Sequence, residues 1–214
     1  AQAYFAAKEG KHTLVTETGA GQWGTALTHA ARLMGLNCVV FWVRSVYNWK
    51  ADRLTFMKLL GADVHASPSK ITKTGRQFLE KDAEHHGSLG IAVSEGLEYA
   101  ETHEGTVYGL GSVLNHVLIH QTVEGLEAKK QLEIAGDYPD VIYGCIGGGS
   151  SFAGLFWPFY YDKVSGKASK DTRFVATEAT ACPKVTKGEY TYDHGDTAKL
   201  TPLVPMHTIG HDFI

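Results

Sequence analysis

A glutamate followed by a glycine-rich loop is the first feature of the sequence that could carry chemistry. Glu17 ends the apolar stretch of the segment 14–27, LVTETGAGQWGTAL, whose three glycines are spaced as G-x-G-x-x-G. That spacing is typical of a dinucleotide-binding turn when an acidic residue follows about 20 positions later. The next apolar stretch ends instead on Arg44, so an NADP site stays open as an alternative.

A smaller anion suits this first loop better than a pyrophosphate. The carboxylate of Glu17 would repel a pyrophosphate lying on the amides that follow it, whereas those amides and a hydroxyl could hold a substrate carboxylate. Glu17 would then face the reacting part of the ligand as a general acid or base. The predicted carboxylate-binding residues are Thr18, Gly19, Ala20, Gly21, Gln22 and Trp23.

A second glycine loop follows another apolar stretch, in the segment 140–155, DVIYGCIGGGSSFAGL. Three consecutive glycines let a ligand approach backbone N–H groups closely, and two hydroxyls follow at the expected start of a helix. Hydrogen bonds to a charged group contribute about 1.5–3 kcal/mol each, so several can hold a phosphate without a lysine or an arginine. The predicted phosphate-binding residues are Gly147, Gly148, Gly149, Ser150 and Ser151.

The two loops together indicate chemistry on an amino acid. A phosphorylated cofactor, a pocket for a carboxylate and an adjacent general acid are the parts that an enzyme using pyridoxal 5'-phosphate (PLP) needs. No metal site is predicted, because the H-x-x-x-H pairs of the sequence lack an obvious third ligand. A PLP enzyme is therefore the primary hypothesis.

The elements that must position these loops alternate between strand and helix, which predicts an α/β fold with parallel sheets flanked by helices. We expect residues 1–136 to be the remainder of an N-terminal domain with the carboxylate-binding loop and a mobile subdomain, in which the polar stretch 67–88 is the least regular part. Residues 137–214 would begin a C-terminal, phosphate-binding domain. The predicted strands are 12–17, 37–43, 62–66, 106–110, 140–146 and 173–178, and the predicted helices include 22–35, 48–60, 89–103, 113–135, capped by Ser112, and 150–163.

The composition excludes several classes of function. The 214 residues are 43% hydrophobic and 20% charged, as in ordinary globular proteins. A net charge of −3 without a run of lysine or arginine argues against a nucleic-acid partner. No apolar run approaches the roughly 18 residues that span a bilayer, so we expect a soluble, cytoplasmic protein without a membrane partner. Cys38, Cys145 and Cys182 are interpreted as buried thiols.

Four stretches of the sequence carry a resemblance to a known family: TETGAGQWGTAL, GSVLNHVLIHQTVEGLEAKKQLE, PDVIYGCIGGGSSFAGL and ACPKVTKGEYTYDHGDTAKLTPL. They closely resemble the second branch of the tryptophan synthase beta-chain family, over essentially all 214 residues. The resemblance implies a fold type II PLP enzyme that joins L-serine and indole to give L-tryptophan and water. It also implies a homodimer at full length and leaves open whether an alpha-type subunit binds.

The resemblance assigns roles to individual residues. The glutamate before T-G-A-G-Q is the acid/base residue of the family and matches Glu17, and the loop after it binds the substrate carboxylate. The family's G-G-G-S-N loop binds the cofactor phosphate and matches residues 147–151, with Ser151 in place of the usual asparagine. A G-[ST] pair that lines the cofactor site matches Gly111 and Ser112.

The resemblance also implies what the chain lacks. The Schiff-base lysine of the family lies in a segment that leads into the helix beginning AQAYF, which places it before Ala1. The groups that contact the pyridine nitrogen would lie beyond Ile214. We therefore expect a fragment that is inactive alone. Alternatives are another fold type II PLP lyase, an NADP-binding oxidoreductase of the Rossmann type and a non-catalytic module.

Overall fold

The computed structural model describes residues 1–181, 183 and 185–188. The chain divides into two compact units. The described part of the first is residues 1–111, and that of the second is residues 112–188 except 182 and 184. Both units are mixtures of helices and parallel strands, so the predicted α/β class is confirmed. The predicted domain boundary after residue 136 falls between a helix and a strand of the second unit.

The first unit is built on a parallel sheet of the strands β1 (Thr13–Thr18), β2 (Asn37–Val43), β3 (Asp63–Ser67) and β4 (Thr106–Tyr108). The strand order is β3-β2-β1-β4, which places β1 between two neighbours. Every residue of β1 is buried, as expected of a central strand covered on both faces.

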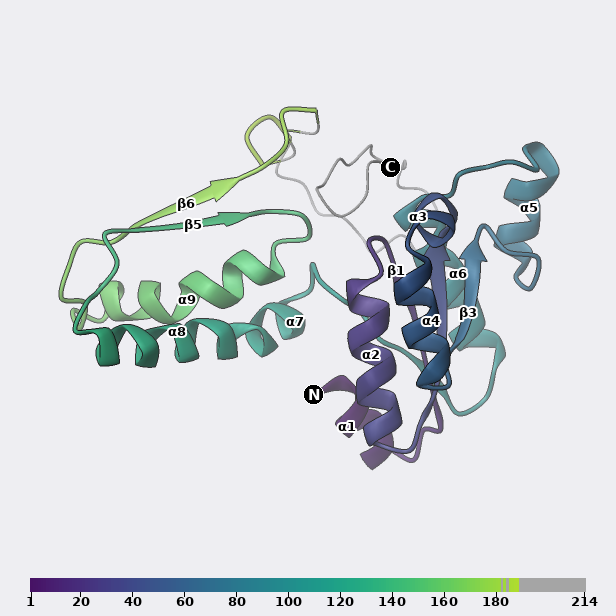
Figure 1. The fold of residues 1–214 in the computed structure, drawn as a ribbon, viewed down its shortest axis with the longest axis horizontal. Coiled ribbons are helices and arrows are strands. Elements are labelled where there is room, and N and C mark those ends of the chain that lie inside the picture. Colours follow the sequence, from purple (N-terminus) through teal and green to yellow (C-terminus); the bar gives the residue numbers. More distant parts are fainter. Residues whose placement is uncertain (182, 184, 189–214) are drawn as a thin grey trace. The chain divides into compact units, whose positions relative to one another are not determined.

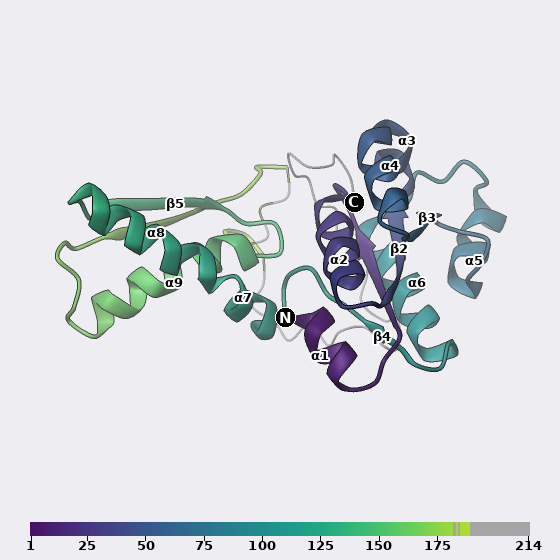
Figure 2. The same cartoon turned by 60° about the horizontal axis from the view of Figure 1, so that its bottom comes forward.

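Helices cover both faces of this sheet (Figures 1 and 2). Alternate residues of the central strands point to opposite faces. Val40 and Trp42 belong to a core cluster packed against α1, α2 and α4, whereas Val15 and Phe41 pack with Ala92 of α6. The helices of this unit are α1 (Gln2–Lys8), α2 (Gln22–Leu33), α3 (Arg44–Trp49), α4 (Ala51–Leu59), α5 (Lys73–Lys81) and α6 (Leu89–Thr102).

The second unit pairs two parallel strands, β5 (Val141–Cys145) and β6 (Arg173–Thr177), and adds the helices α7 (Asn115–His120), α8 (Thr122–Ala135) and α9 (Ser150–Val164). Ile142, Phe152 and Phe159 form its buried core, between β5 and α9. An ion pair from Lys129 Nζ to Asp162 Oδ2, at 2.6 Å, joins α8 to α9.

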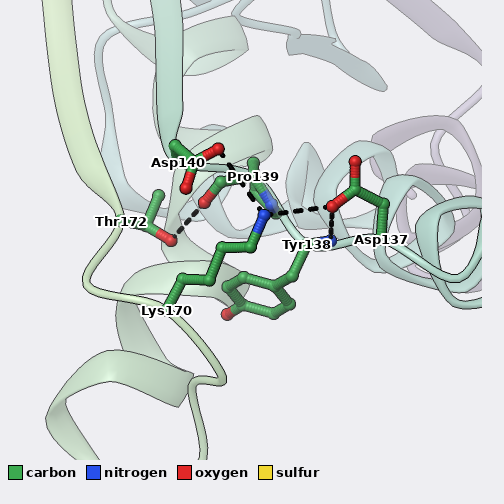
Figure 3. A network of polar contacts seen from close by, with 6 residues as sticks. All are labelled: Asp137, Tyr138, Pro139, Asp140, Lys170 and Thr172. Carbon is green, nitrogen blue, oxygen red and sulfur yellow. Dashed lines mark hydrogen bonds and ion pairs between the residues drawn. The ribbon is translucent and has the colours of Figure 1, made fainter.

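A polar network ties together the two segments that lead into β5 and β6 (Figure 3). Lys170 Nζ lies 3.1 Å from Asp137 Oδ1 and 3.5 Å from Asp140 Oδ2. Next to it, Thr172 Oγ1 donates a 2.6 Å hydrogen bond to the carbonyl of Pro139. These contacts hold the beginnings of the two strands side by side on the surface, at the end opposite to the glycine loop.

The predicted elements agree with the structure except at a few places. The predicted helix 48–60 is divided between α3 and α4, and the predicted helix 113–135 is interrupted at Gln121 between α7 and α8. Ser112 does not cap that helix, because Val113 adopts a positive φ of 61° and the helix begins only after Leu114. The polar stretch 67–88 contains α5 and is more regular than predicted, while the mobile subdomain stays a prediction.

The burial predicted for the cysteines is right for one residue and wrong for another. Cys38 on β2 is buried, but Cys145 is exposed. β5 has its buried residue at Ile142, and the alternation along the strand turns Tyr143 and Cys145 to the surface. Cys182 lies outside the described residues. In the part of the chain that the structure describes, no helix is long and apolar enough to cross a membrane.

Candidate active site

Glu17 lies at the carboxyl end of β1, the edge of a parallel sheet where ligands usually bind. Only 6% of its surface is exposed. Burial removes water from the carboxylate and raises the pKa of Glu17 from its ordinary value of 4.5 to about 7, and this effect exceeds the opposing effect of the hydrogen bonds it accepts. Near neutral pH the side chain therefore populates both its acid and its base form.

The hydroxyl of Tyr108 donates a hydrogen bond to Glu17 Oε2. Tyr108 ends β4, the strand next to β1, so parallel pairing brings the two side chains to the same edge of the sheet. Thr16 Oγ1 is a second neighbour of that oxygen, at 3.3 Å. Sequence reasoning missed Tyr108, which lies in the middle of the predicted strand 106–110, because no local pattern shows that this strand is the neighbour of β1.

The loop after Glu17 is held by bonds to its carbonyl groups. Trp42 Nε1 donates to the carbonyl of Gly19 at 2.8 Å, and Arg53 Nη1 donates to the carbonyl of Ala20 at 2.5 Å. Gly21 has a φ of +90°, and a Cβ there would lie 2.6 Å from Trp42 Cζ2. A fixed glycine loop with its carbonyls engaged leaves its N–H groups for an anion. Neither Trp42 nor Arg53 was anticipated from the sequence.

The start of α2 completes the loop. Gly21 is its N-cap and has no side chain that could accept a hydrogen bond, so the N–H groups of Gln22 and Trp23 remain for a ligand. The N–H of Gly24 donates to Thr18 Oγ1 at 3.1 Å, which leaves the Thr18 hydroxyl proton available for donation. The side chain of Gln22, by contrast, lines an open hollow between α2 and α4 together with Arg53.

Trp23 connects the loop to the residues that follow β4. Its Nε1 donates to Thr16 Oγ1 at 2.6 Å, and Thr16 Oγ1 donates to the carbonyl of Gly109 at 2.5 Å. The indole ring packs directly on Gly111, where a Cβ would lie 2.5 Å from Trp23 Cγ. Gly111 therefore has to be a glycine, and the structure brings it together with the first loop.

The second glycine loop joins β5 to α9. Gly149 has a φ of +92° and is the N-cap of this 15-residue helix, again without a hydrogen bond to a capping side chain. A Cβ at Gly147 or at Gly149 would meet open space, whereas a Cβ at Gly148 would collide with Ser112 Oγ. The loop thus leaves room for a ligand on one side and is closed by Ser112 on the other.

Two hydroxyl groups converge on this loop. Ser112 Oγ donates to Ser150 Oγ at 2.9 Å and accepts a weak hydrogen bond, at 3.4 Å, from the N–H of Ser150. Ser150 is buried, whereas Ser151 is exposed. Uncapped N–H groups, open space at two glycines and converging hydroxyls are the donor set that a phosphate requires, so the residues present fit the phosphate group of PLP.

Arg44, on which the NADP alternative depended, is used differently. It begins α3, and its guanidinium donates to the carbonyl of Pro68. The arginine thus has a structural partner within its own unit.

The chain matches known proteins in two comparisons. The family model described as pyridoxal-phosphate dependent enzyme matches residues 1–209. "Tryptophan synthase beta chain 2" of Methanothermobacter thermautotrophicus is 58% identical over 214 residues, which are 100% of this chain and 49% of that protein. The corresponding protein of Aquifex aeolicus is 55% identical over 215 residues and 50% of its length, and "Tryptophan synthase beta chain" of Thermococcus onnurineus is 55% identical over 213 residues and 47% of its length.

These matches confirm the resemblance that the sequence motifs carry. The chain spans about half the length of the curated relatives it matches. With parallel sheets flanked by helices and a glycine loop at the start of a helix, the chain belongs to the family of pyridoxal-phosphate dependent enzymes.

Proposed function

We propose that the full-length protein carrying this chain joins L-serine and indole to give L-tryptophan and water, with PLP as its cofactor. The observation that carries the proposal is the buried Glu17, whose pKa is about 7, at the end of β1 and directly before the T-G-A-G-Q loop. The name of the relatives, which are 53–58% identical to this chain, supports the same reaction.

The cofactor would be held mainly through its phosphate. The proposed contacts are the N–H groups of the loop 147–149 and of the first turn of α9, the hydroxyls of Ser150 and Ser151, and the pair Gly111 and Ser112 that lines the site. Charge-assisted hydrogen bonds of this kind contribute about 1.5–3 kcal/mol each. When bound, PLP supplies an electron sink that makes the α proton and the β substituent of an amino acid labile.

The loop 18–23 would bind the carboxylate of L-serine. Its backbone N–H groups and the Thr18 hydroxyl donate, while Trp42 and Arg53 keep the loop in place from its carbonyl side. The positive end of α2 adds about 0.3–1 kcal/mol for a bound anion. A substrate carboxylate fixed there would place the serine side chain toward Glu17.

Glu17 would move the protons of the replacement. Hydroxide is a poor leaving group, so the protonated carboxyl donates its proton to the departing β hydroxyl and water leaves. The resulting carboxylate then stabilises positive charge that develops on the indole nitrogen as indole attacks through carbon. A pKa near 7 allows both roles at neutral pH, and general acid/base help typically contributes about 10²- to 10⁴-fold in rate.

Activity is proposed for the full-length protein and not for these 214 residues alone. The resemblance assigns the Schiff-base lysine of the family to none of the lysines of this chain, so neither covalent attachment of the cofactor nor abstraction of the α proton is proposed for these residues. The full-length protein is further proposed to be a cytoplasmic homodimer. Exposed apolar side chains along α7 and α8, such as Ile119, Val123 and Leu126, support a partner surface.

The test measures tryptophan formed from L-serine and indole by the full-length protein with PLP. Glu17→Gln is expected to lower kcat by at least about 100-fold while the affinity for PLP, measured by equilibrium dialysis, stays unchanged. Normal tryptophan formation by this variant would remove Glu17 from the mechanism. Borohydride reduction of the 214-residue chain with PLP, followed by peptide mapping, tests the proposal that these residues alone are inactive. A stoichiometric lysine adduct together with turnover would contradict that proposal.

A further inference from the structure

Glu17 has two hydroxyl neighbours, and only one of them has a proton to give. Thr16 Oγ1 lies 3.3 Å from Glu17 Oε2 but only 2.5 Å from the carbonyl oxygen of Gly109. A threonine hydroxyl carries a single proton, and the shorter contact to the carbonyl takes it. Thr16 also accepts from Trp23 Nε1 at 2.6 Å, which fixes its orientation. In the described part of the chain, Tyr108 is therefore the side chain that donates a hydrogen bond to the Glu17 carboxyl, at Oε2.

We propose that Tyr108 is the positioning residue of Glu17: its hydroxyl binds Oε2, orients the carboxyl and leaves Oε1 to exchange the proton with the substrate. Both hydroxyl contacts fall on Oε2, so the two carboxyl oxygens are distinguished by their surroundings. This assignment rests on the proposed function for its kinetic consequence, while the contact itself does not depend on which reaction the protein catalyses.

Tyr108 is suited to this role because its hydroxyl stays protonated. Burial and the adjacent charge of Glu17 raise the pKa of Tyr108 far above its usual range. The phenol is therefore a hydrogen-bond donor at every pH at which Glu17 titrates. Its ring is fixed in the cluster formed by Val15, Val39 and Phe41, so the direction of the O–H bond is set by packing.

The hydrogen bond stabilises the charged form of Glu17 and so lowers its pKa, against the larger effect of burial. Among the described residues, the other contacts that lower it are those with the backbone at residues 17 and 111 and the longer contact with Thr16, and none of these groups is titratable. From α6, which also packs on β1, the buried carboxylate of Glu95 is engaged by residues 67–72. Removing the phenol hydroxyl should therefore raise the pKa of Glu17.

The test is Tyr108→Phe in the full-length protein, which keeps the ring and removes the donor. Losing one hydrogen bond to a charged acceptor is expected to move the pKa of Glu17 upward by about one to two units. The titration is followed by infrared difference spectroscopy of the carboxyl band, with Glu17→Gln identifying the Glu17 signal. This readout does not require turnover.

The kinetic arm uses the same variant. After water has left, the Glu17 carboxylate must persist until indole attacks. A higher pKa leaves little of that carboxylate at pH 7, so kcat for tryptophan formation should fall by about 5- to 50-fold there and recover toward pH 9, for a shift of about one to two units. The KM for L-serine should stay unchanged, because Tyr108 lies outside the loop 18–23. A merely structural role would lower kcat equally at both pH values.

Tyr99→Phe is the matched control. Tyr99 packs against the same cluster, with its ring 5.9 Å from that of Phe41, but it lies on α6 and its contacts there are with His103. It should leave the Glu17 band and kcat unchanged. A Glu17 band that titrates in Tyr108→Phe as in the wild type would overturn the assignment. If the band shifts but the wild type forms no tryptophan, the role of Tyr108 stands and the proposed function fails.

Discussion

The raised pKa of Glu17 predicts a specific pH dependence of folding stability. An unfolded chain releases this proton near pH 4.5, whereas the folded chain retains it up to a pH of about 7. Its contribution to stability is therefore fully present below pH 4.5 and is lost as the pH rises through 7. At 1.36 kcal/mol per pKa unit, the loss is about 3 kcal/mol. Glu17→Gln cannot titrate, so the variant should gain about 3 kcal/mol relative to the wild type between pH 4.5 and pH 8.

Urea unfolding at several pH values measures this difference. Tryptophan fluorescence reports on the right part of the molecule, because Trp23, Trp42 and Trp49 lie in the first unit, and only Trp157 lies in the second. Glu9→Gln removes an exposed glutamate of the same unit and supplies the reference for loss of one carboxyl. A stability difference between Glu17→Gln and the wild type that stays constant from pH 4.5 to 8 would refute the reasoning.

Three further substitutions test the loops and the core. Gly148→Asp forces a side chain and a negative charge against Ser112, which closes one side of the proposed phosphate site, so the loop must shift while a charge is added beside it. PLP binding to the full-length protein should weaken by at least about 100-fold, equivalent to one or two charge-assisted hydrogen bonds, and unchanged affinity in a fluorescence titration would exclude the site. Gly21→Ala should lower the free energy of unfolding, measured in urea, by about 2–4 kcal/mol, because the positive φ and the contact with Trp42 both oppose a Cβ. The control Gly10→Ala also has a positive φ but meets open space, so it should lower the free energy of unfolding by only about 1–2 kcal/mol. Equal losses would mean that the Trp42 side chain moves aside without cost. Glu95→Gln presents an amide to hydroxyl and N–H donors and should lower the unfolding free energy by about 3 kcal/mol, and a loss below 1 kcal/mol would show that this network contributes little.

Local patterns were enough to predict most elements of the fold. The alternation of apolar strands with helices, separated by glycine turns, indicates each strand of both parallel sheets, because strand formation and turns depend on neighbouring residues. The interruption at Gln121 was not predictable, since α7 and α8 form a continuous helical pattern in the sequence. The left-handed conformation of Val113 was equally hidden, because β-branched residues rarely adopt it and no sequence signal marks it.

The candidate site was predicted in part for the same reason. Glu17 and the loop after it are adjacent in sequence, so one motif indicates them together. Tyr108 is 91 positions away from Glu17, and the contact exists because β4 pairs with β1 and not with another strand. Alternation of strands and helices does not determine the lateral order of strands in a sheet, so this partner could be found only from the structure.

Two buried glutamates of the first unit show why one of them is suited to chemistry and the other to structure. Glu95 is completely buried and accepts hydrogen bonds at both oxygens, from Ser67 Oγ, from the N–H and Oγ of Ser69 and from Thr72 Oγ1. Its lone pairs are thus committed to the segment that precedes α5. Glu17 receives a side-chain hydrogen bond from Tyr108, whereas the single hydroxyl proton of Thr16 goes to the Gly109 carbonyl. Burial therefore dominates the pKa of Glu17. A carboxyl whose pKa is dominated by burial keeps a proton near neutral pH and can transfer it, whereas a carboxyl held by several side-chain and backbone donors anchors the segment around it.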